Sequence, residues 1–422
     1  MSVDIASLEQ TPLSSPTAAS RRLSVADRWA RQLVLGQFAC LRQGAVTVVE
    51  GVERQTFGDA SDEGLRATIT VNDSRLYRAL ALGGSIASGE TYMRGLWTCD
   101  DLTALVRIFV RNRELLDGLE SGARWWRTPL QTLRHRLRRN SRRGSRQNIQ
   151  AHYDLGNGFF ALFLDETLMY SCGVFETETS TLREASVAKN ELLCRKLQLS
   201  PQDHLLEIGT GWGGFALHAA ANYGCRITTT TISREQHELA RRRIAEAGLA
   251  DRVEVLLKDY RDFGPAWNGR FDKLVSIEMI EAVGEAFLDG YFAVCHRLLK
   301  PGGRMALQAI TIPDQQYDSY RRTVDFIQRY IFPGGFLPSI GAICGSLGRA
   351  TSLHLTHLED LAPHYARTLA CWRERFLANL DSVREQGFPE TFIRMWEFYL
   401  CYCEGAFRER GSGCVQLVLQ KV

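Results

Sequence analysis

From about residue 150 onward, short apolar runs alternate with stretches of helical periodicity. The segments between the runs repeat apolar residues at helical spacing, as in Arg234–Ala247. The runs that fit buried strands are His204–Gly209, Arg226–Ile232, Arg252–Leu257, Phe271–Ile277 and Arg304–Ile310. Alternation of this kind predicts an α/β domain whose parallel sheet is covered by helices on both faces.

The first part of the chain has a mixed pattern and predicts a smaller, separate domain. Residues 21–123 combine helical and strand signals, including an alternating stretch at Leu65–Val71. The glycine-containing segment Gly83–Trp97 predicts a turn-rich connection. Residues 1–20 are expected to form a flexible tail, 124–146 an Arg-rich linker and 147–422 the larger domain.

A glycine-rich turn follows the first apolar run of the larger domain. In Leu205–Phe215 (LLEIGTGWGGF), Glu207 lies near the end of the predicted strand, and Gly209, Gly211 and Gly213 follow it. Glycines tolerate positive φ and let a ligand approach the backbone closely. Open α/β sheets bind ligands at this place, outside the carboxyl ends of their strands. The segment therefore predicts a ligand site, with Glu207 placed to meet a positively charged small molecule.

Two cofactor classes fit this glycine spacing. Gly209, Gly211 and Gly214 satisfy G-x-G-x-x-G, which also occurs in nicotinamide-dinucleotide enzymes. Those enzymes hold the ribose with an acid about 20 residues further on. The corresponding stretch Thr228–Ile232 (TTTTI) has no carboxylate. The strand–acid–x–G–x–G pattern instead resembles the nucleoside-binding motif of class I S-adenosylmethionine methyltransferases, which we favour over a nicotinamide oxidoreductase.

Composition and charge narrow the candidate partners. The 422 residues include 51 Lys and Arg and 48 Asp and Glu, and the net charge of +3 excludes a surface that binds polyanions throughout. Residues 121–153 contain nine Arg, no acid, and the pair Trp125 and Trp126. This run favours contact with anionic lipid over a solvated linker, and no nucleic-acid-binding motif accompanies it. The eleven cysteines lack metal-site or disulfide-framework spacing, so we expect reduced thiols and no metal.

Eight further segments, in order, resemble one enzyme family. They are Gln147–Phe160 (QNIQAHYDLGNGFF), Met169–Cys172, Thr231–Gln236, Asp259–Phe263, Ile277–Gly284 (IEMIEAVG), Tyr330–Pro338, His364–Trp372 and Tyr399–Arg408. Residues 147–422 resemble the catalytic part of the cyclopropane-fatty-acyl-phospholipid synthase and mycolic acid cyclopropane synthase family. The resemblance implies a class I methyltransferase, Rossmann-like domain with a helical lid insertion near Pro313–Ala350. The region before it resembles the extra N-terminal domain of the bacterial phospholipid enzymes and implies a smaller mixed α/β domain.

The resemblance implies which residues contact S-adenosylmethionine. Thr231 and Gln236 match the family's ribose-side motif, and Tyr260 and Arg261 would flank the adenine. Tyr170, Ser171 and the turn Gly209–Gly213 complete the implied contacts. Glu207, near the end of the predicted strand, is a further candidate contact.

The resemblance also implies the reaction. The family transfers a methyl group from S-adenosylmethionine to the cis double bond of an unsaturated phospholipid acyl chain. The resulting carbocation loses a proton as a cyclopropane ring closes, and bound bicarbonate is the general base. The positions that fall on the family's active site are Cys172, Glu281, Tyr365 and Cys403. An apolar channel would protect the carbocation from water, with aromatic rings from Tyr330, Phe332, Phe336 and Trp372.

One departure from the family pattern affects the expected product. In the family's LHTI-type segment a histidine helps to hold the anion, whereas Leu307–Ile310 reads LQAI and places Gln308 there. Gln offers an NH₂ donor but cannot become cationic. We expect cyclopropanation, and the alternative is a methyl-branched, methylene or hydroxylated acyl product.

The expected setting is the cytoplasm, at the inner face of the membrane. The sequence shows no secretory signal and no uninterrupted apolar span. We expect peripheral contact with unsaturated phospholipid, no nucleic acid, and a smaller domain that presents lipid or forms a homodimer. The sequence leaves open the head group, the double-bond position and the oligomeric state. A non-catalytic lipid-surface protein is the other alternative, and it would bind vesicles but not S-adenosylmethionine.

Overall fold

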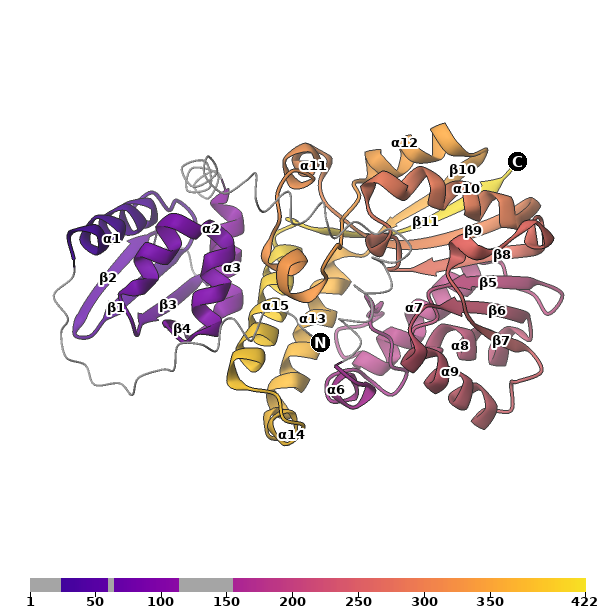
Figure 1. Ribbon diagram of the computed structural model, residues 1–422, viewed down its shortest axis with the longest axis horizontal. Coiled ribbons are helices and arrows are strands. Elements are labelled where there is room, and N and C mark those ends of the chain that lie inside the picture. Colours follow the sequence, from indigo (N-terminus) through magenta and orange to yellow (C-terminus); the bar gives the residue numbers. More distant parts are fainter. Residues whose placement is uncertain (1–23, 60–63, 114–154) are drawn as a thin grey trace. The chain divides into compact units, whose positions relative to one another are not determined.

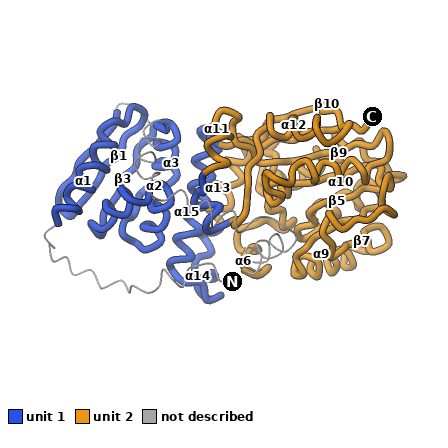
Figure 2. Tube along the Cα trace, turned by 45° about the horizontal axis from the view of Figure 1, so that its top comes forward, with its two compact units in different colours: residues 1–134, 323–331, 376–411 blue, residues 135–322, 332–375, 412–422 orange. Residues whose placement is uncertain are grey.

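The computed structural model describes residues 24–59, 64–113 and 155–422. These residues fall into two compact units, which Figure 2 colours separately. The first unit combines residues 1–134 with 323–331 and 376–411, and the second combines 135–322, 332–375 and 412–422. The units thus differ from the predicted division at 124–146, because two later segments group with the N-terminal part. The tail at 1–20 and the Arg-rich linker lie outside the described residues.

The second unit contains a seven-stranded sheet in the order β10-β11-β9-β8-β5-β6-β7. The five strands from β5 to β9 are all parallel to one another. Strand β11 runs antiparallel to both of its neighbours, β9 and β10. The strands are β5 (His204–Ile208), β6 (Arg226–Thr231), β7 (Val253–Leu257), β8 (Phe271–Ile277), β9 (Leu299–Thr311), β10 (Leu353–Asp360) and β11 (Gly413–Lys421). All five predicted strands are confirmed, although β9 begins earlier than its sequence pattern indicates.

Helices cover both faces of this sheet, as Figure 1 shows. One core joins Leu205 of β5 to α7 (Leu182–Leu197), α8 (Gly214–Tyr223) and α9 (Arg234–Glu246). The other core joins Leu206 to α10 (Leu288–Leu298) and α12 (Ile340–Ala350). Successive strand residues point to opposite faces, so Leu205 and Leu206 enter different cores. The remaining helical segments are α6 (Asn157–Ala161), η1 (Tyr260–Asp262), η2 (Pro265–Trp267), η3 (Ile280–Ala282), η4 (Glu285–Phe287), α11 (Asp314–Tyr320) and α13 (Ala362–Ala378).

The first unit is a smaller mixed α/β structure. Its four-stranded sheet has the order β2-β1-β3-β4, in which β1 pairs parallel with β3 and the other pairs are antiparallel. The predicted alternating strand is confirmed as β3. Its elements are α1 (Val25–Phe38), β1 (Ala45–Glu50), β2 (Glu53–Gly58), β3 (Arg66–Val71), α2 (Arg75–Met93), β4 (Trp97–Cys99), α3 (Leu102–Arg111), the π-helix Ile327–Ile331, α14 (Leu380–Glu385) and α15 (Glu390–Arg408).

The predicted turn-rich connection at Gly83–Trp97 is wrong, because most of this segment belongs to helix α2. Gly84 interrupts the helix with φ 58° and ψ −147°, and the helix then continues to Met93. Gly89 is needed for packing rather than for a turn. A Cβ at this position would lie 2.4 Å from the Phe326 ring and 3.1 Å from the Phe398 ring. The glycines therefore mark a kink and a close approach within one helix.

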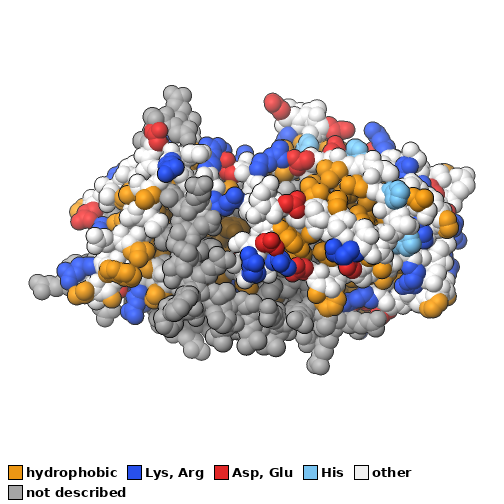
Figure 3. Space-filling view, turned by 90° about the horizontal axis from the view of Figure 1, so that it is seen from above, with side chains coloured by type: hydrophobic (Ala, Val, Ile, Leu, Met, Phe, Trp, Pro, Cys, Tyr) orange, Lys and Arg blue, Asp and Glu red, His pale blue; other side chains and the backbone are white. Residues whose placement is uncertain are grey.

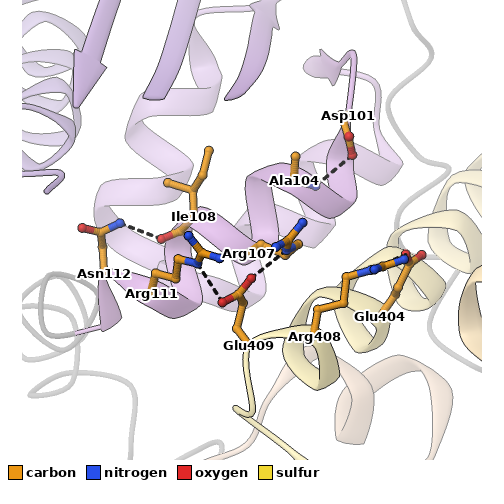
Figure 4. Close-up of polar contacts among 9 residues, drawn as sticks. All are labelled: Asp101, Ala104, Arg107, Ile108, Arg111, Asn112, Glu404, Arg408 and Glu409. Carbon is orange, nitrogen blue, oxygen red and sulfur yellow. Dashed lines mark hydrogen bonds and ion pairs between the residues drawn. The ribbon is translucent and has the colours of Figure 1, made fainter. Parts of the chain in front are cut away.

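Helices α3 and α15 are joined by ion pairs as well as by packing (Figure 4). Arg107 Nε and Arg111 Nε each lie 2.7 Å from one of the two carboxylate oxygens of Glu409. Burial alone would raise the pKa of Glu409, but hydrogen bonds from Arg111 and Arg107 outweigh it and lower that pKa. The ion pairs of Glu409 therefore stabilise the fold at neutral pH, and this stabilisation is lost as the pH falls through the lowered pKa of Glu409.

We expect Gly89→Ala to lower the free energy of unfolding by about 1–3 kcal/mol, because an added methyl group overpacks a filled contact. Gly36→Ala is the matched control, since Gly36 also lies in a helix of this unit but a Cβ there meets no atom within 4 Å. Chemical denaturation of the full chain measures both changes. Equal effects of the two substitutions would contradict the close packing of Gly89.

Candidate active site

The glycine-rich turn lies between β5 and α8, at the carboxyl edge of the parallel sheet. Gly209, Gly211 and Gly213 have φ values of 104°, 51° and 84°, which other residues rarely adopt. The N–H of Gly209 donates to the Thr230 carbonyl at 3.0 Å and ties the turn to β6. A Cβ at Gly211 would meet no atom within 4 Å, so the backbone is open to a ligand there.

The predicted ribose-side and adenine-side residues follow β6 and β7 at the same edge. Thr231 Oγ1 donates to Gln236 Oε1 at 2.9 Å, and both side chains are buried. Arg261 donates from Nε and Nη2 to the two carboxylate oxygens of Asp259, at 2.9 and 2.6 Å. Its guanidinium carbon lies 5.6 Å from the centre of the Tyr260 ring. The implied cofactor residues thus come from three neighbouring strand ends, where one small molecule can reach them.

Glu207 is buried inside the sheet rather than displayed at its edge. It pairs in register with Thr229 of β6, whose hydroxyl donates to Glu207 Oε2 at 2.6 Å. Burial raises the pKa of Glu207 to about 8. The described contacts of this carboxyl are structural, and its expected meeting with a cationic ligand remains a prediction.

An aromatic group surrounds Tyr170, just before Ser171. The centre of the Tyr170 ring lies 5.1 Å from that of Trp372, 5.4 Å from that of Phe160 and 6.4 Å from that of Phe332. The adjacent Ser171 is buried, and its hydroxyl has no hydrogen-bond partner among the described residues. Rings therefore line the chain next to the predicted cofactor contacts.

Three of the four rings predicted to surround a carbocation lie in the second unit, and two of these contact Tyr170. Phe332 and Trp372 both contact Tyr170. Phe336 instead packs against Tyr317 and Tyr320 in the core beside α10 and α12. Tyr330 belongs to the first unit, where its hydroxyl donates to Glu90 at 2.7 Å. The chain passes from the first unit to the second between residues 331 and 332. The closeness of these rings along the chain gave no sign of that boundary.

Three predicted catalytic residues converge on a carboxylate that the sequence reasoning did not single out. The Cys172 backbone N–H and Gln308 Nε2 each donate to Glu278 Oε1 at 2.8 Å. The Tyr365 hydroxyl donates to Glu278 Oε2 at 2.6 Å. Burial raises the pKa of Glu278, and these three hydrogen bonds oppose that rise. The Glu278 cluster, defined as these four residues, lies where β8 and β9 end.

Glu281 lies three residues after Glu278 and has a different environment. Its Oε1 accepts a hydrogen bond from the Ile310 N–H at 2.5 Å, while Oε2 is buried without a hydrogen-bond partner among the described residues. Burial, reinforced by the nearby Glu278 charge, raises the pKa of Glu281 to about 8. Two acids thus face the same strand end with different degrees of hydrogen bonding.

Cys403, the remaining predicted catalytic residue, lies on α15 in the first unit. The residue is partly buried, and burial raises the pKa of its thiol. Its expected role in the reaction remains a prediction.

The sequence also did not predict a role for Lys189, which is a buried lysine. Lys189 of α7 is fully buried, and its Nζ has no hydrogen-bond partner among the described residues. Burial lowers its pKa to about 8, and the charge of Glu278 is the largest opposing influence. Lys189 resembles any surface lysine in the sequence, whereas Glu278 carried a signal, because an acid directly after a buried strand faces the ligand edge of the sheet.

Comparison with known proteins identifies the family of this chain. Residues 140–417 match the sequence profile of the family described as mycolic acid cyclopropane synthetase. The chain is 43% identical over 340 residues to tuberculostearic acid methyltransferase UfaA1 of Mycobacterium tuberculosis, covering 79% of this chain and 78% of that protein. It is 36% identical over 368 residues to the cyclopropane-fatty-acyl-phospholipid synthase of Escherichia coli K12, covering 84% and 88%.

A solved structure shows the same similarity in three dimensions. Mycolic acid cyclopropane synthase CmaA1, complexed with SAH and CTAB, is 34% identical and superposes with a TM-score of 0.61. The similarity covers 65% of this chain and 98% of that one. Together with the class I methyltransferase sheet, it confirms the predicted fold and family. The chain belongs to the mycolic acid cyclopropane synthetase family and is an S-adenosylmethionine-dependent methyltransferase.

Proposed function

We propose that this enzyme transfers the methyl carbon of S-adenosylmethionine to the cis double bond of an unsaturated phospholipid acyl chain. The observation that carries the proposal is the common edge of the sheet, where the open backbone at Gly211 and the Glu278 cluster both lie. A Cβ at Gly209 would lie 3.3 Å from Met279, the residue after Glu278. A methyl donor on the glycine turn is therefore near a group that can accept a proton.

The residues present fit S-adenosylmethionine. When bound, it supplies a sulfonium-activated methyl group, which an alkene can attack without prior activation. The chain's task is then to place the alkene against that methyl, and correct placement is worth about 7–11 kcal/mol. The rings of Tyr170, Trp372 and Phe332 offer apolar surface that excludes water and faces that favour positive charge.

The residues present do not fit bicarbonate, the expected general base. Gln308 and Tyr365 were expected to hold that anion, but both donate to the Glu278 carboxylate instead. The Cys172 N–H does the same. No step of the proposed reaction is therefore assigned to bicarbonate.

The product is proposed to be a cyclopropane ring, with a methylene, methyl-branched or hydroxylated chain as the alternative. The Escherichia coli relative is named as a cyclopropane-fatty-acyl-phospholipid synthase, which supports the ring. The Mycobacterium tuberculosis relative, at 43% identity, is named as a tuberculostearic acid methyltransferase, which supports the alternative.

We also propose peripheral contact with phospholipid at the cytoplasmic face of the membrane. None of the described helices combines the length and apolar character required to span a bilayer. Val25 and Trp29, four residues apart on α1, are 76% and 61% exposed, and an exposed tryptophan suits a membrane interface. On the face drawn in Figure 3, acidic and basic side chains of the described residues are intermingled. We propose that the exposed apolar side chains of α1 contribute to this contact by insertion. A homodimer remains part of the proposal for the smaller unit.

Incubation with methyl-labelled S-adenosylmethionine and vesicles of unsaturated phospholipid tests the function. We expect label in the acyl chain, and no label with vesicles of saturated phospholipid. NMR of the extracted lipid separates a ring from a methylene or methyl branch. Absence of label from unsaturated acyl chains across several head groups would contradict the proposed reaction.

We expect Gly211→Ala to weaken S-adenosylmethionine binding about tenfold, because its methyl group would occupy the open space above the turn. Gly269→Ala is the matched control, since Gly269 also has positive φ and open surroundings but lies before β8. Both substitutions introduce backbone strain of about 1 kcal/mol. Titration calorimetry should show weaker binding only for Gly211→Ala, and unchanged affinity would remove the turn from the binding site.

A further inference from the structure

We propose that the Glu278 carboxylate is the proton acceptor of this reaction, in place of a bound bicarbonate. The inference rests on the proposed methyl transfer and assigns a further catalytic residue to it. Glu278 directly follows β8, and its carboxylate receives three hydrogen bonds from groups that the family resemblance assigned to the anion site or its neighbourhood.

The shape of the ligand supports this replacement. A carboxylate and bicarbonate present the same planar pair of oxygens to hydrogen-bond donors. At Glu278 one oxygen accepts from the Cys172 N–H and Gln308 Nε2, both at 2.8 Å, and the other accepts from the Tyr365 hydroxyl at 2.6 Å. A free anion would have to displace the side chain from all three donors.

The orientation of the Gln308 amide follows from a chain of hydrogen bonds. Lys196 can only donate, and its Nζ donates to Gln416 Oε1 at 2.6 Å. Gln416 must then turn its NH₂ toward Gln308 Oε1, to which it donates at 2.8 Å. The Gln308 NH₂ is thereby left facing Glu278, so Gln308 is a donor to the carboxylate.

This arrangement explains why a neutral side chain suffices at position 308. A free anion has to be captured from solvent, and a cationic histidine assists that capture. The carboxylate of Glu278 is covalently attached and loses less freedom on being held. A donor that only orients it is enough, and glutamine supplies that donor.

The backbone at Glu278 is unusual for a residue with a side chain. Its φ is 48°, in the left-handed region, at a cost of about 1 kcal/mol or more. The Glu278 N–H donates to the Gln308 carbonyl at 2.8 Å, so the main chains as well as the side chains of these two residues are joined. Strain of this kind is typical of functional positions.

The charged and titratable groups around Glu278 come from five elements. They are Cys172 of the loop before α7, Lys189 of α7, Glu281 of η3, Tyr365 of α13 and Cys414 of β11. Burial raises the pKa of Glu278, while the hydrogen bonds and Lys189 oppose the rise. A carboxylate with a raised pKa is a stronger base than an exposed one, which suits proton removal.

The atoms of the step balance with Glu278 as the base. The alkene π pair forms a bond to the methyl carbon, the sulfur–methyl pair stays on sulfur, and the other alkene carbon becomes cationic. Glu278 takes a proton from the added methyl, whose C–H pair closes the three-membered ring. If a hydride first migrates to the cationic carbon, the same proton loss gives a methylene branch. The lipid gains one carbon and two hydrogens in both cases.

The first experiment compares Glu278→Gln with Glu238→Gln, an exposed control on α9. Glutamine keeps the size of the side chain but cannot accept the proton, so we expect kcat to fall at least about 100-fold. Calorimetry should show retained S-adenosylmethionine binding. Activity of Glu278→Gln within about tenfold of the unchanged enzyme would overturn the proposal.

The unchanged enzyme gives a test that needs no substitution. Turnover measured in buffers freed of carbon dioxide and in buffers with added bicarbonate should agree within about twofold. A loss of turnover on removal of bicarbonate, restored by its addition, would overturn the role of Glu278. If the unchanged enzyme puts no label into lipid at all, the proposed function fails rather than the assignment of the base.

Substitution of Lys189 tests the charge state of the acceptor. Removing this cation in Lys189→Met should raise the pKa of Glu278, because Lys189 lowers it. The base acts when ionised, so the rise of kcat with pH should move to higher pH. Lys273→Met, in the first half of β8 and five residues before Glu278, is the control. An unmoved profile in a folded Lys189→Met enzyme would show that Glu278 does not limit the rate.

Discussion

A carboxylate that leaves water has to find hydrogen-bond donors, and the larger unit places three of them around Glu278. Each donor comes from a different part of the chain, namely the segment before α7, strand β9 and helix α13. Correct folding of all three is therefore a condition for satisfying one charged group. The site and the packing of the unit depend on each other through this contact.

Parallel pairing of β5, β8 and β9 brings the two halves of the proposed chemistry together. Parallel strands end at one edge of a sheet, so the glycine turn after β5 and Glu278 after β8 become neighbours without a direct hydrogen bond. Strand β11 then adds Gln416 beside Gln308 in register, which sets the direction of the amide. The order of the strands thus determines which group of the Gln308 amide faces Glu278, as well as the fold of the unit.

Much of the larger unit could be predicted from local pattern, because each parallel strand is a short apolar run between helical stretches. The prediction for Gly83–Trp97 was wrong because Gly89 is required by a tertiary contact with Phe326. The residues next to Gly89 in the sequence give no sign of that contact. The family resemblance located Cys172, Gln308 and Tyr365 but assigned them to an external anion. The position of Glu278 directly after a buried strand signals the ligand edge of the sheet, but its three long-range hydrogen bonds cannot be read from the sequence. Lys189 was overlooked because its burial depends on the packing of α7.

The packing of α3 against α15 has a consequence for how this chain can be divided. Gly405 of α15 lies so close to α3 that a Cβ there would stand 2.6 Å from Val106. A shortened enzyme beginning at residue 147 would keep α15 but strip away the helix that covers it. Removal of the N-terminal part would therefore expose the face of α15 that packs against α3.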